Sequence, residues 1–531
     1  MIGVEIANQE EVIPAGVETQ AALTPWRFST RGVAVRLFVT CWVIYCLHFA
    51  TNTVREIYPA LSLGDHLSFD VSEYAGLHPD IFEVPGRGVY INNNPGASIL
   101  GAIPYALARP ITDRIVEYVK GARAANPEAS PPEYNSQYPM AREFYRKAYE
   151  RGLDVKFGLA AVVTQAFCMA PLSALSVVVM FYILLSLTSS LKTSLVLSFL
   201  FAVATPVFYR TAQLNQNLLI AHFALFAFAL LWRPWDDPLY PRRPRYLLAG
   251  LCCGWAVVLD YSGLVVLLVL SAYGLTRRKS LPEDSRSRAD IWHFALGVTL
   301  CAAFLMAYQW VAFGSPFYPA QHYMPQATFT EYGYRGMDAP HLDLLWQTAF
   351  GMRFGLFTSA PLLLLALYIP GWFNSRTCLA PRREMLCIIV LSLAFFLFCS
   401  SNQYSRMQFN TGVRHIVPVV PFLFLLSAGV LLRIPRLVAV LIGIITSYWS
   451  WCLVMYRDVE RGLGVFESII HISFEGFRLP WMITLEQMGY LTRASATPLL
   501  LLAAAVVCAI WTVRMGNTGQ PARSLAANSR I

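Results

Sequence analysis

The stretch NTVREIYPALSLGDHLSFDVSEYAGLHPDIFEVPGRGVYINNNPGASILGAIPYALARP, residues 52–110, decides how the rest of the chain is arranged. Its acids are Glu56, Asp65, Asp70, Glu73, Asp80 and Glu83, and they are followed by Asn92, Asn93, Asn94 and a short apolar run over 95–110. Only 14% of the 531 residues are charged, whereas 56% are hydrophobic. Acids clustered in one early stretch of such a chain indicate chemistry held at a membrane face.

The composition predicts an all-α polytopic membrane protein. Soluble domains are about 25% charged, and this chain has repeated uncharged runs long enough to cross a bilayer as helices. The net charge is +9, but no basic patch is interleaved with base-stacking aromatics, so we expect no nucleic acid partner. No nucleotide-binding motif or metal-ligand spacing is present, so we predict no cofactor and no metal site, although a divalent metal requirement is not excluded.

The run 95–110 sets the orientation of everything after it. If it crossed the membrane, the arginine-rich stretches 233–245 and 276–288 would lie outside. If it lies on the membrane surface, both stretches fall inside, which satisfies the excess of Lys and Arg in cytoplasmic loops. We therefore predict that 95–110 is a surface helix, and that 53–156 is a large extracytoplasmic loop with amphipathic surface helices.

The apolar runs predict about twelve transmembrane helices. They are 33–53, 157–187, 193–209, 214–232, the two arms of a hairpin within 246–276, 291–313, 353–373, 384–401, 415–432, 436–455 and 495–513. Run 157–187 would be about 46 Å long as a helix, so it should tilt or protrude. The hairpin is required because both flanks of 246–276 are basic, and its tip at Asp260 should lie beside a water-filled cavity.

This topology divides the chain into four parts. Residues 1–32 form a cytoplasmic tail, because arginines stand at the start of the first span. Residues 33–313 form a catalytic-type transmembrane module that includes the outer loop 53–156. Residues 314–515 form a second module with outer loops 314–352 and 456–494, and 516–531 form a cytoplasmic tail.

The loop acids are candidates for a general base. Glu56 follows the first span closely, and Asp65 lies nine residues further on. A carboxylate at this point can accept the proton of an acceptor hydroxyl as a sugar is transferred. The alternative is that these are solvated loop acids. Asn93 and Asn94 offer amide groups to a sugar or a phosphate, or serve only as a helix cap before Pro95.

Four further candidates lie at the outer ends of spans. Asp260 separates two hydrophobic arms, where an acid is costly unless it faces a cavity or pairs with a base. Arg353 and Arg414 are placed to hold a lipid-linked phosphate bidentately, or alternatively to extend toward the interface. His415 is predicted to contribute beside Arg414, with a purely structural role as the alternative.

Three segments in this order resemble a known family. They are LAGLCCGWAVVLDYSGLVVLLVL at 248–270, FGSPFYP at 313–319 and GVRHIVPVVPFLFLL at 412–426. Together with the first span and its acidic loop they resemble the bacterial GT-C glycosyltransferases, the protein-mannosyltransferase-like enzymes that use polyprenyl-phosphate sugars. The resemblance covers about 33–432, and the order of the elements carries it.

The resemblance implies an inverting transfer from a polyprenyl-phosphate sugar to a glycan, lipid or protein acceptor. It implies the bacterial inner membrane, with the site facing the extracytoplasmic side, and a catalytic carboxylate soon after the first span. Relatives often have an Asp-Glu pair there, whereas this chain has Arg55 and Glu56, so the acid that takes this role stays open. Arg55, Asn93, Asn94, Arg414 and His415 stand where family motifs would contact substrate.

A secondary transporter or lipid-sugar flippase is the main alternative, because twelve spans with both termini inside also fit that class. Transporters tend to show two related halves and midplane charges. This chain has one dominant loop and almost no charge within its spans. A lipid-binding scaffold without catalysis is a third possibility, and the enzyme is favoured.

Overall fold

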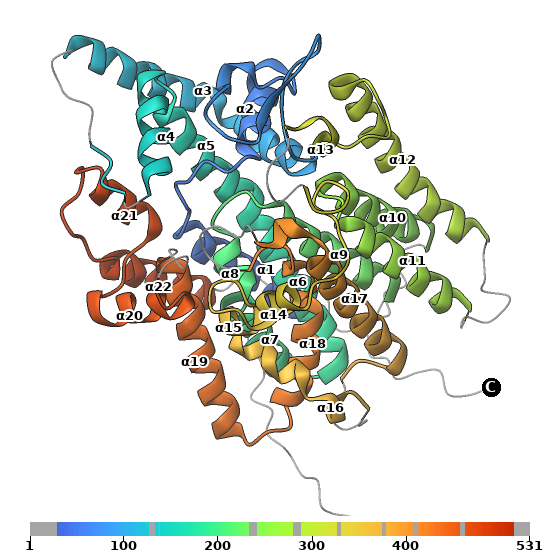
Figure 1. Ribbon diagram of the computed structural model, residues 1–531. Helices are drawn as coiled ribbons and strands as arrows, with labels where there is room; N and C mark the ends of the chain where they lie inside the picture. The colour runs from blue at the N-terminus through green and yellow to red at the C-terminus, as the bar shows by residue number, and fades with distance from the viewer. Residues whose placement is uncertain are drawn as a thin grey trace, which may run out of the picture.

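The chain folds as a bundle of helices with one small hairpin of strands in the computed structural model (Figure 1). The structure describes residues 29–126, 133–136, 138–232, 242–279, 288–325, 331–373, 379–406, 413–456 and 462–513. Strands β1 (Ile81–Val84) and β2 (Gly88–Ile91) pair antiparallel, with Ile81 opposite Ile91. Both strands belong to the acidic loop and not to the bundle.

Apolar helices form most of the bundle. Among the described residues, four are long and apolar enough to span a bilayer: Asp154–Thr188, α12 (Arg288–Phe313), α17 (Arg382–Ser401) and α19 (Arg436–Met455). Six shorter apolar helices accompany them. The protein is therefore a multi-pass integral membrane protein, as the composition predicts. The count of twelve spans remains a prediction.

The predicted long helix and the predicted hairpin are both present. Asp154–Thr188 is one run of 35 residues, composed of α5 (Asp154–Thr164), a π-helical turn (Gln165–Met169) and α6 (Ala170–Thr188). Segment 246–276 folds back on itself as α10 (Arg242–Leu259) and α11 (Gly263–Lys279), with Asp260 at the turn.

The predicted span 353–373 is wrong as a single helix. The structure breaks it into α15 (Leu356–Ser359), a 3₁₀ segment (Pro361–Leu367) and α16 (Ile369–Phe373). Pro361 and Pro370 have no backbone N–H to continue a helix, and a proline ring clashes with the preceding turn. Hydropathy alone does not predict the break in the helix at these prolines.

The π-helical turn is held by the first helix, α1 (Thr30–Cys46). Nε2 of Gln165 donates to the carbonyl of Tyr45 at 2.7 Å, and Nε1 of Trp42 donates to the carbonyl of Ala166 at 2.7 Å. Such turns appear where other groups bond with the helix backbone. Two polar side chains thus fasten α1 to the long helix within an otherwise apolar interface.

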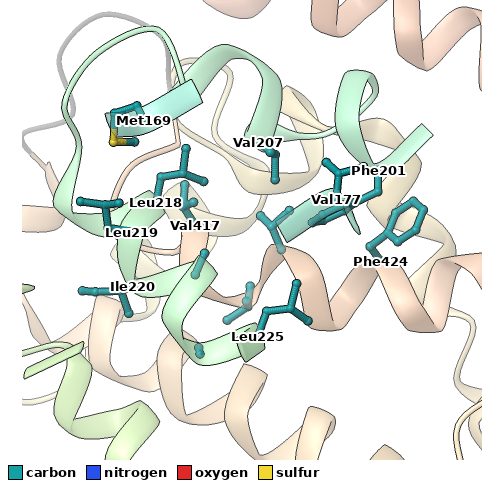
Figure 2. Packing of buried hydrophobic residues seen from close by; sticks show 14 of the residues in the cluster. Met169, Val177, Phe201, Val207, Leu218, Leu219, Ile220, Leu225, Val417 and Phe424 are labelled. Carbon is teal, nitrogen blue, oxygen red and sulfur yellow. The ribbon is translucent and has the colours of Figure 1, made fainter. Parts of the chain in front are cut away.

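The core lies where α6, α7 (Leu191–Val203), α9 (Gln216–Trp232) and α18 (Val420–Leu431) meet (Figure 2). Leu218, Leu219 and Ile220 of α9 are fully buried although they are consecutive. A helix that is apolar all round is expected to be enclosed by others. Phe201 and Phe424 join α7 to α18, with ring centroids 5.2 Å apart.

Helices α10 and α12 approach each other at glycines. A Cβ at Gly250 would lie 2.1 Å from the carbonyl oxygen of Phe294, and one at Gly297 would lie 2.5 Å from that of Leu247. Small residues allow helix backbones to touch in membranes. The hairpin that presents Asp260 is thereby packed tightly against α12.

The run 95–110 forms the first half of α3 (Gly96–Ala125), which extends well beyond the prediction. Ile103, Leu107 and Ile111 are exposed and lie four residues apart, so they share one face of α3. This is the pattern of an interfacial helix. Its position on the membrane surface remains a prediction.

Several shorter elements surround the bundle. They are α2 (Ile57–His66), η1 (Ser72–Tyr74), α4 (Pro139–Glu150), α8 (Pro206–Arg210), α13 (Ala320–Tyr323), α14 (Leu342–Phe350), η6 (Gln403–Arg406), η7 (Val417–Val419), α20 (Val465–Glu475), α21 (Pro480–Gln487) and α22 (Thr497–Thr512). In Figure 1, α2, α3 and α4 gather at the top of the view, and α19 extends toward the opposite end.

Helix α21 is fastened to the end of α1. Nε1 of Trp481 donates to the carbonyl of Leu47 at 3.0 Å, and the Trp481 ring stacks on Phe49 with centroids 5.8 Å apart. The carbonyl of Gln487 accepts a hydrogen bond of 2.9 Å from the backbone N–H of Asn135. These contacts hold α21 beside the acidic loop 53–156, where it forms one side of the cavity described next.

Candidate active site

A cavity of about 1,820 Å³ lies between the acidic loop and the helical bundle. Its lining comes from 51–92, 119–158, 210–215, 260–265, 319–337, 398–415 and 455–490. Each of these is a predicted outer loop or the outer end of a predicted span. In the predicted topology, all the lining segments therefore lie on the extracytoplasmic side.

Arg55 is the centre of an ion pair network in this cavity. Its Nε lies 3.5 Å from Oε1 of Glu56, and its Nη1 lies 3.4 Å from Oδ2 of Asp80. Nη1 also donates to the backbone carbonyl of Asn92 at 3.0 Å. Burial alone lowers the pKa of Arg55, but the carboxylates of Glu56 and Asp80 outweigh it, so the net shift is upward. Arg55 is therefore a permanent cation between two acids.

Two more arginines line the same cavity. Arg210 ends α8 and is 2% exposed, and Arg414 precedes η7. Burial and, after it, the positive charge of Arg55 lower the pKa of Arg414 to about 10, although nearby acids oppose the shift. An anion bound beside Arg414 would favour its charged form. We refer to Arg55, Glu56, Asp80, Arg210, Asp260 and Arg414 as the ion cluster.

Asp260 enters the ion cluster from the hairpin tip. Its Oδ2 accepts a hydrogen bond of 2.8 Å from Nε2 of Gln216, and its Oδ1 accepts one of 2.9 Å from the backbone N–H of Ser262. Both donors are neutral groups, so neither forms an ion pair with the carboxylate. The predicted hairpin thus places its acid beside the arginines.

Part of the cavity lining is apolar. We define the apolar wall as Met140, Phe144, Phe157, Ile483, Leu485 and Met488, from α4, α5, α21 and the turn after α21. At its edge the guanidinium of Arg123 binds both carboxylate oxygens of Asp154, at 2.9 and 2.8 Å. One cavity therefore offers both ionic groups and hydrocarbon contacts.

The structure brings together five of the nine predicted site residues. Arg55, Glu56, Asp260, Arg414 and His415 all line the cavity. They come from three segments that are far apart in sequence. The sequence-based choice of residue types at the outer ends of spans was therefore informative.

Asp65 lies outside the cavity lining, and its role as a catalytic base stays a prediction. Its Oδ2 lies 2.8 Å from Nζ of Lys156, and its Oδ1 lies 3.4 Å from Nε of Arg109. Tyr105 donates a further hydrogen bond of 3.3 Å to Oδ1. The carboxylate of Asp65 joins α2 to α3 and α5, and it is not among the lining residues.

Three other predicted residues also lie outside the cavity lining. Arg353 is exposed to solvent. Asn94 donates to the backbone carbonyl of Val257 at 2.9 Å, and Asn93 is buried beside it. No side-chain cap is formed at the start of α3, so the helix-cap alternative is also wrong. Asn94 fastens α3 to α10 where a Cβ at Gly96 would lie 2.7 Å from the carbonyl oxygen of Val258.

Several lining residues escape the sequence-based choice of site. They are His78, Asp80, Asn92, Arg210, Gln213, Asn215, Arg335 and Tyr404. Asp80 belongs to the six loop acids, but nothing in the sequence sets it above Asp65. Arg210 was visible as a charge between two apolar runs, the same signal that indicated Asp260.

One group of possible metal ligands occurs among the described residues. Asp65, His66 and Glu73 place a ligand atom each within 4.8 Å of one another. The ammonium group of Lys156 lies 2.8 Å from Asp65 and 3.4 Å from Glu73. A cation already neutralises these carboxylates, so the geometry does not favour a metal ion there.

Comparison with known proteins agrees with the resemblance. Residues 116–323 match the sequence profile of the family described as dolichyl-phosphate-mannose-protein mannosyltransferase. The crystal structure of ArnT from Cupriavidus metallidurans bound to undecaprenyl phosphate is similar with a TM-score of 0.44 and 13% identity, over 91% of this chain and 73% of that one. No curated protein matches the chain.

The matched segment runs from α3 to α13 and includes Asp154, Arg210 and Asp260 of the cavity. It therefore contains two members of the ion cluster and three of the apolar wall, whereas Arg55, Glu56, Asp80 and Arg414 lie outside it. Residues 116–323 therefore have the sequence pattern of the dolichyl-phosphate-mannose-protein mannosyltransferase family.

Proposed function

We propose that this enzyme transfers a sugar from a polyprenyl-phosphate donor to an acceptor at the extracytoplasmic face of the bacterial inner membrane, with inversion at the anomeric carbon. The observation that supports this best is the cavity itself, because the ion cluster and the apolar wall line the same space. A polyprenyl-phosphate sugar combines these two chemistries in one molecule. The description of the matched family also names a polyprenyl phosphate sugar of this kind.

The arginines of the ion cluster are suited to the phosphate. The positive charge of Arg55 lowers the pKa of Arg414, and Arg210 lines the same cavity. Guanidinium groups bind phosphate oxygens in pairs of parallel hydrogen bonds. Arg353, which was predicted to share this role, does not line the cavity. We assign phosphate binding to Arg414 with Arg55 and Arg210.

Glu56 is our choice for the general base. It is the first carboxylate after α1, its side chain is 6% exposed, and it lines the cavity. In the proposed step the acceptor oxygen forms a bond to the anomeric carbon while the bond from that carbon to the phosphate oxygen breaks. The acceptor proton passes to Glu56, and polyprenyl phosphate leaves with the electron pair. Asp80 holds Arg55 from the other side.

The topology belongs to the same proposal. We propose twelve spans, with cytoplasmic tails at 1–32 and 516–531 and with modules at 33–313 and 314–515. Every charged lining residue comes from a segment that the distribution of basic residues assigns to the outer side. The acceptor, whether glycan, lipid or protein, then reaches the cavity from the extracytoplasmic space.

Activity of the purified protein tests the proposal. We expect the protein in detergent to release sugar from at least one of a panel of undecaprenyl-phosphate sugars (mannose, glucose, galactose, arabinose), by transfer to an extract of membrane glycans or slowly to water. Glu56→Gln should lower the rate about 10²- to 10⁴-fold, and Asp113→Asn, which lies outside the cavity, should not. If the protein instead moves labelled lipid-linked sugar across vesicles at equal rates with and without Glu56→Gln, the flippase alternative holds.

A further inference from the structure

A second set of polar groups lines the cavity next to the ion cluster, and all of them are uncharged. They are Tyr58, His78, Asn92 and His415, which we call the neutral set. Arg55 joins this set to the ion cluster, because it donates to the backbone carbonyl of Asn92. The proposed function leaves the neutral set without a role.

His78 presents a hydrogen-bond donor of fixed identity. Its Nδ1 accepts a hydrogen bond of 3.0 Å from the backbone N–H of Asp80. A neutral imidazole that accepts at Nδ1 carries its proton on Nε2. Burial lowers the pKa of His78, and the nearby Arg55 lowers it further, so the ring stays neutral. The Nε2–H group makes no hydrogen bond to any part of the chain that the structure describes.

The loop around His78 is rigid at this point. The imidazole ring packs edge-on against Tyr58, with centroids 5.7 Å apart. The backbone carbonyl of Asp80 accepts a hydrogen bond of 2.9 Å from Asn92, and the side chain of Asp80 pairs with Arg55. His78 is therefore positioned by the same residues that hold the proposed phosphate-binding arginine.

The other members of the neutral set have polar atoms without a partner. The hydroxyl of Tyr58, Oδ1 of Asn92 and Nε2 of His415 are buried and form no hydrogen bond within the described ranges. Tyr58 is 0% exposed, Asn92 1% and His415 7%. Buried polar atoms are almost always satisfied in a folded protein. These atoms therefore indicate a bound group that the chain itself does not supply.

The mixture of donors and acceptors identifies the chemistry of that group. A phosphate only accepts hydrogen bonds, so Oδ1 of Asn92 has nothing to gain from it. A sugar hydroxyl both donates and accepts, so it can satisfy Oδ1 of Asn92 and Nε2–H of His78 alike. The absence of charge in the neutral set suits hydroxyls and disfavours a charged substituent.

We infer that the neutral set binds the hydroxyl groups of the transferred sugar, with His78 as a specificity-determining donor, while the ion cluster binds the phosphate. This inference rests on the proposed function, because it places the sugar next to a lipid phosphate. It divides the recognition of the donor into two separable parts. Loss of the sugar contacts should spare the lipid phosphate, and loss of the arginines should not.

Binding measurements on the full chain in detergent separate the two parts. The probes are undecaprenyl phosphate without sugar and the same lipid bearing mannose, glucose, galactose or arabinose, each titrated at pH 7.5. We expect the wild-type protein to prefer at least one sugar-bearing lipid over the bare lipid by about tenfold, as a few net hydrogen bonds provide. That lipid then serves as the probe for the variants.

His78→Phe keeps a ring against Tyr58 but removes the Nε2–H donor. We expect it to reduce the preference for the sugar-bearing lipid to within about twofold of unity while the affinity for the bare lipid stays unchanged. Tyr58→Phe should shift the preference in the same direction. His78→Gln retains an N–H at a similar reach and should retain part of the preference. Arg414→Gln is the matched control, and it should weaken both lipids equally.

Each outcome decides. An unchanged preference in His78→Phe, or an equal loss of both lipids, overturns the inference and leaves the proposed function standing. A wild-type protein that prefers no sugar-bearing lipid over the bare lipid overturns the inference as well. A wild-type protein that binds neither lipid overturns the proposed function first. Thermal melting of each variant shows whether the chain is folded. If His78→Phe does not fold, the sugar preference of His78→Gln and Tyr58→Phe decides the test.

Discussion

Nε2 of Gln216 lies 2.8 Å from Oδ2 of Asp260, so α9 holds the acid at the tip of the α10–α11 hairpin. The bond fixes the orientation of the carboxylate. Asp260 also opposes the lowering of the Arg414 pKa, which shows that its charge is felt at the proposed phosphate site.

We predict that Asp260→Asn tightens the binding of sugar-free undecaprenyl phosphate several-fold, because it removes a negative charge beside the bound anion. The asparagine keeps the size of the side chain, but its single oxygen can accept from Gln216 or from Ser262 and not from both. Turnover should fall if release of the lipid product becomes slower. Titration at low and high salt measures the effect, and Gln216→Leu is the control with the charge intact. Weaker binding in Asp260→Asn would mean that the acid supports the phosphate through a bound cation.

Asp65 should matter for stability and not for chemistry. Its pairs with Lys156 and Arg109 join three elements, and its side chain is 6% exposed. Removing one partner of a buried ion pair costs about 3 kcal/mol. We predict that Asp65→Ala lowers the melting temperature clearly, while the folded fraction keeps its turnover number. Asp113→Ala, which breaks the more exposed pair with Arg109, should cost less than about 1 kcal/mol. A normal melting temperature with lost turnover would return Asp65 to the catalytic candidates.

Gly250 tests the contact between α10 and α12. Because an added Cβ would overlap the carbonyl of Phe294, Gly250→Val should force the helices apart and displace the hairpin that presents Asp260. We expect loss of the folded protein from detergent extracts, seen by size-exclusion chromatography. Gly121→Ala in α3 is the matched control, since no atom lies within 4 Å of its Cβ position. It should stabilise the protein by about 0.5 to 1 kcal/mol.

The neutral state of His78 predicts a direction for pH dependence. Burial, Arg55 and Arg414 lower its pKa, and the acids Asp80 and Glu56 oppose them, with a net shift below the ordinary value of 6.5. The preference for a sugar-bearing lipid should therefore stay constant from pH 8 to about 6.5 and fall only at lower pH, when Nδ1 gains a proton and faces the N–H of Asp80.

The folding stability of the protein should depend on pH through the same imidazole of His78. Above 6.5 the imidazole is neutral in both the folded and the unfolded chain, so it contributes no pH dependence. Below 6.5 the unfolded chain takes up the proton first, so folding stability falls as the pH drops toward the lower pKa of the folded state. Melting curves of wild type and His78→Gln between pH 8 and 5 measure this difference. A preference that is already lost near pH 7 would contradict a neutral His78.

Labelling from one side of the membrane tests the orientation. Glu117 is exposed on α3, within the proposed outer loop 53–156. We predict that Glu117→Cys reacts with a membrane-impermeant maleimide added to intact cells. The parent chain with Cys508→Ser serves as background, because Cys508 is the exposed cysteine among the described residues. Labelling only after the inner face is opened would reverse the proposed sidedness.

The sequence predicted those parts of the fold that depend on hydropathy and charge. The hairpin around Asp260 followed from two basic flanks, and the long helix 154–188 followed from an uninterrupted apolar run. The run 353–373 was predicted wrongly, because hydropathy does not register Pro361 and Pro370. The length of α3 was also underestimated, since its second half is polar.

The sequence indicated which types of residue form the site, but not which residues form ion pairs with one another. Glu56 and Arg414 could be chosen because charged groups at the outer ends of spans are costly unless they are used. Asp65 was equally plausible in sequence, and only Lys156, more than ninety residues later, draws it away from the cavity. Asp80, and not Asp65, lines the cavity because the fold of the loop brings its carboxylate to Arg55. His78 had no sequence signal at all.

The size of the cavity has a kinetic consequence. At about 1,820 Å³ it exceeds the roughly 1,000 Å³ upper range of pockets that enclose one small ligand. Both reaction partners can therefore occupy it together in a ternary complex, and the chain has no need to store the sugar on one of its own side chains between visits. Initial-rate plots at several fixed concentrations of the second substrate should give intersecting and not parallel lines.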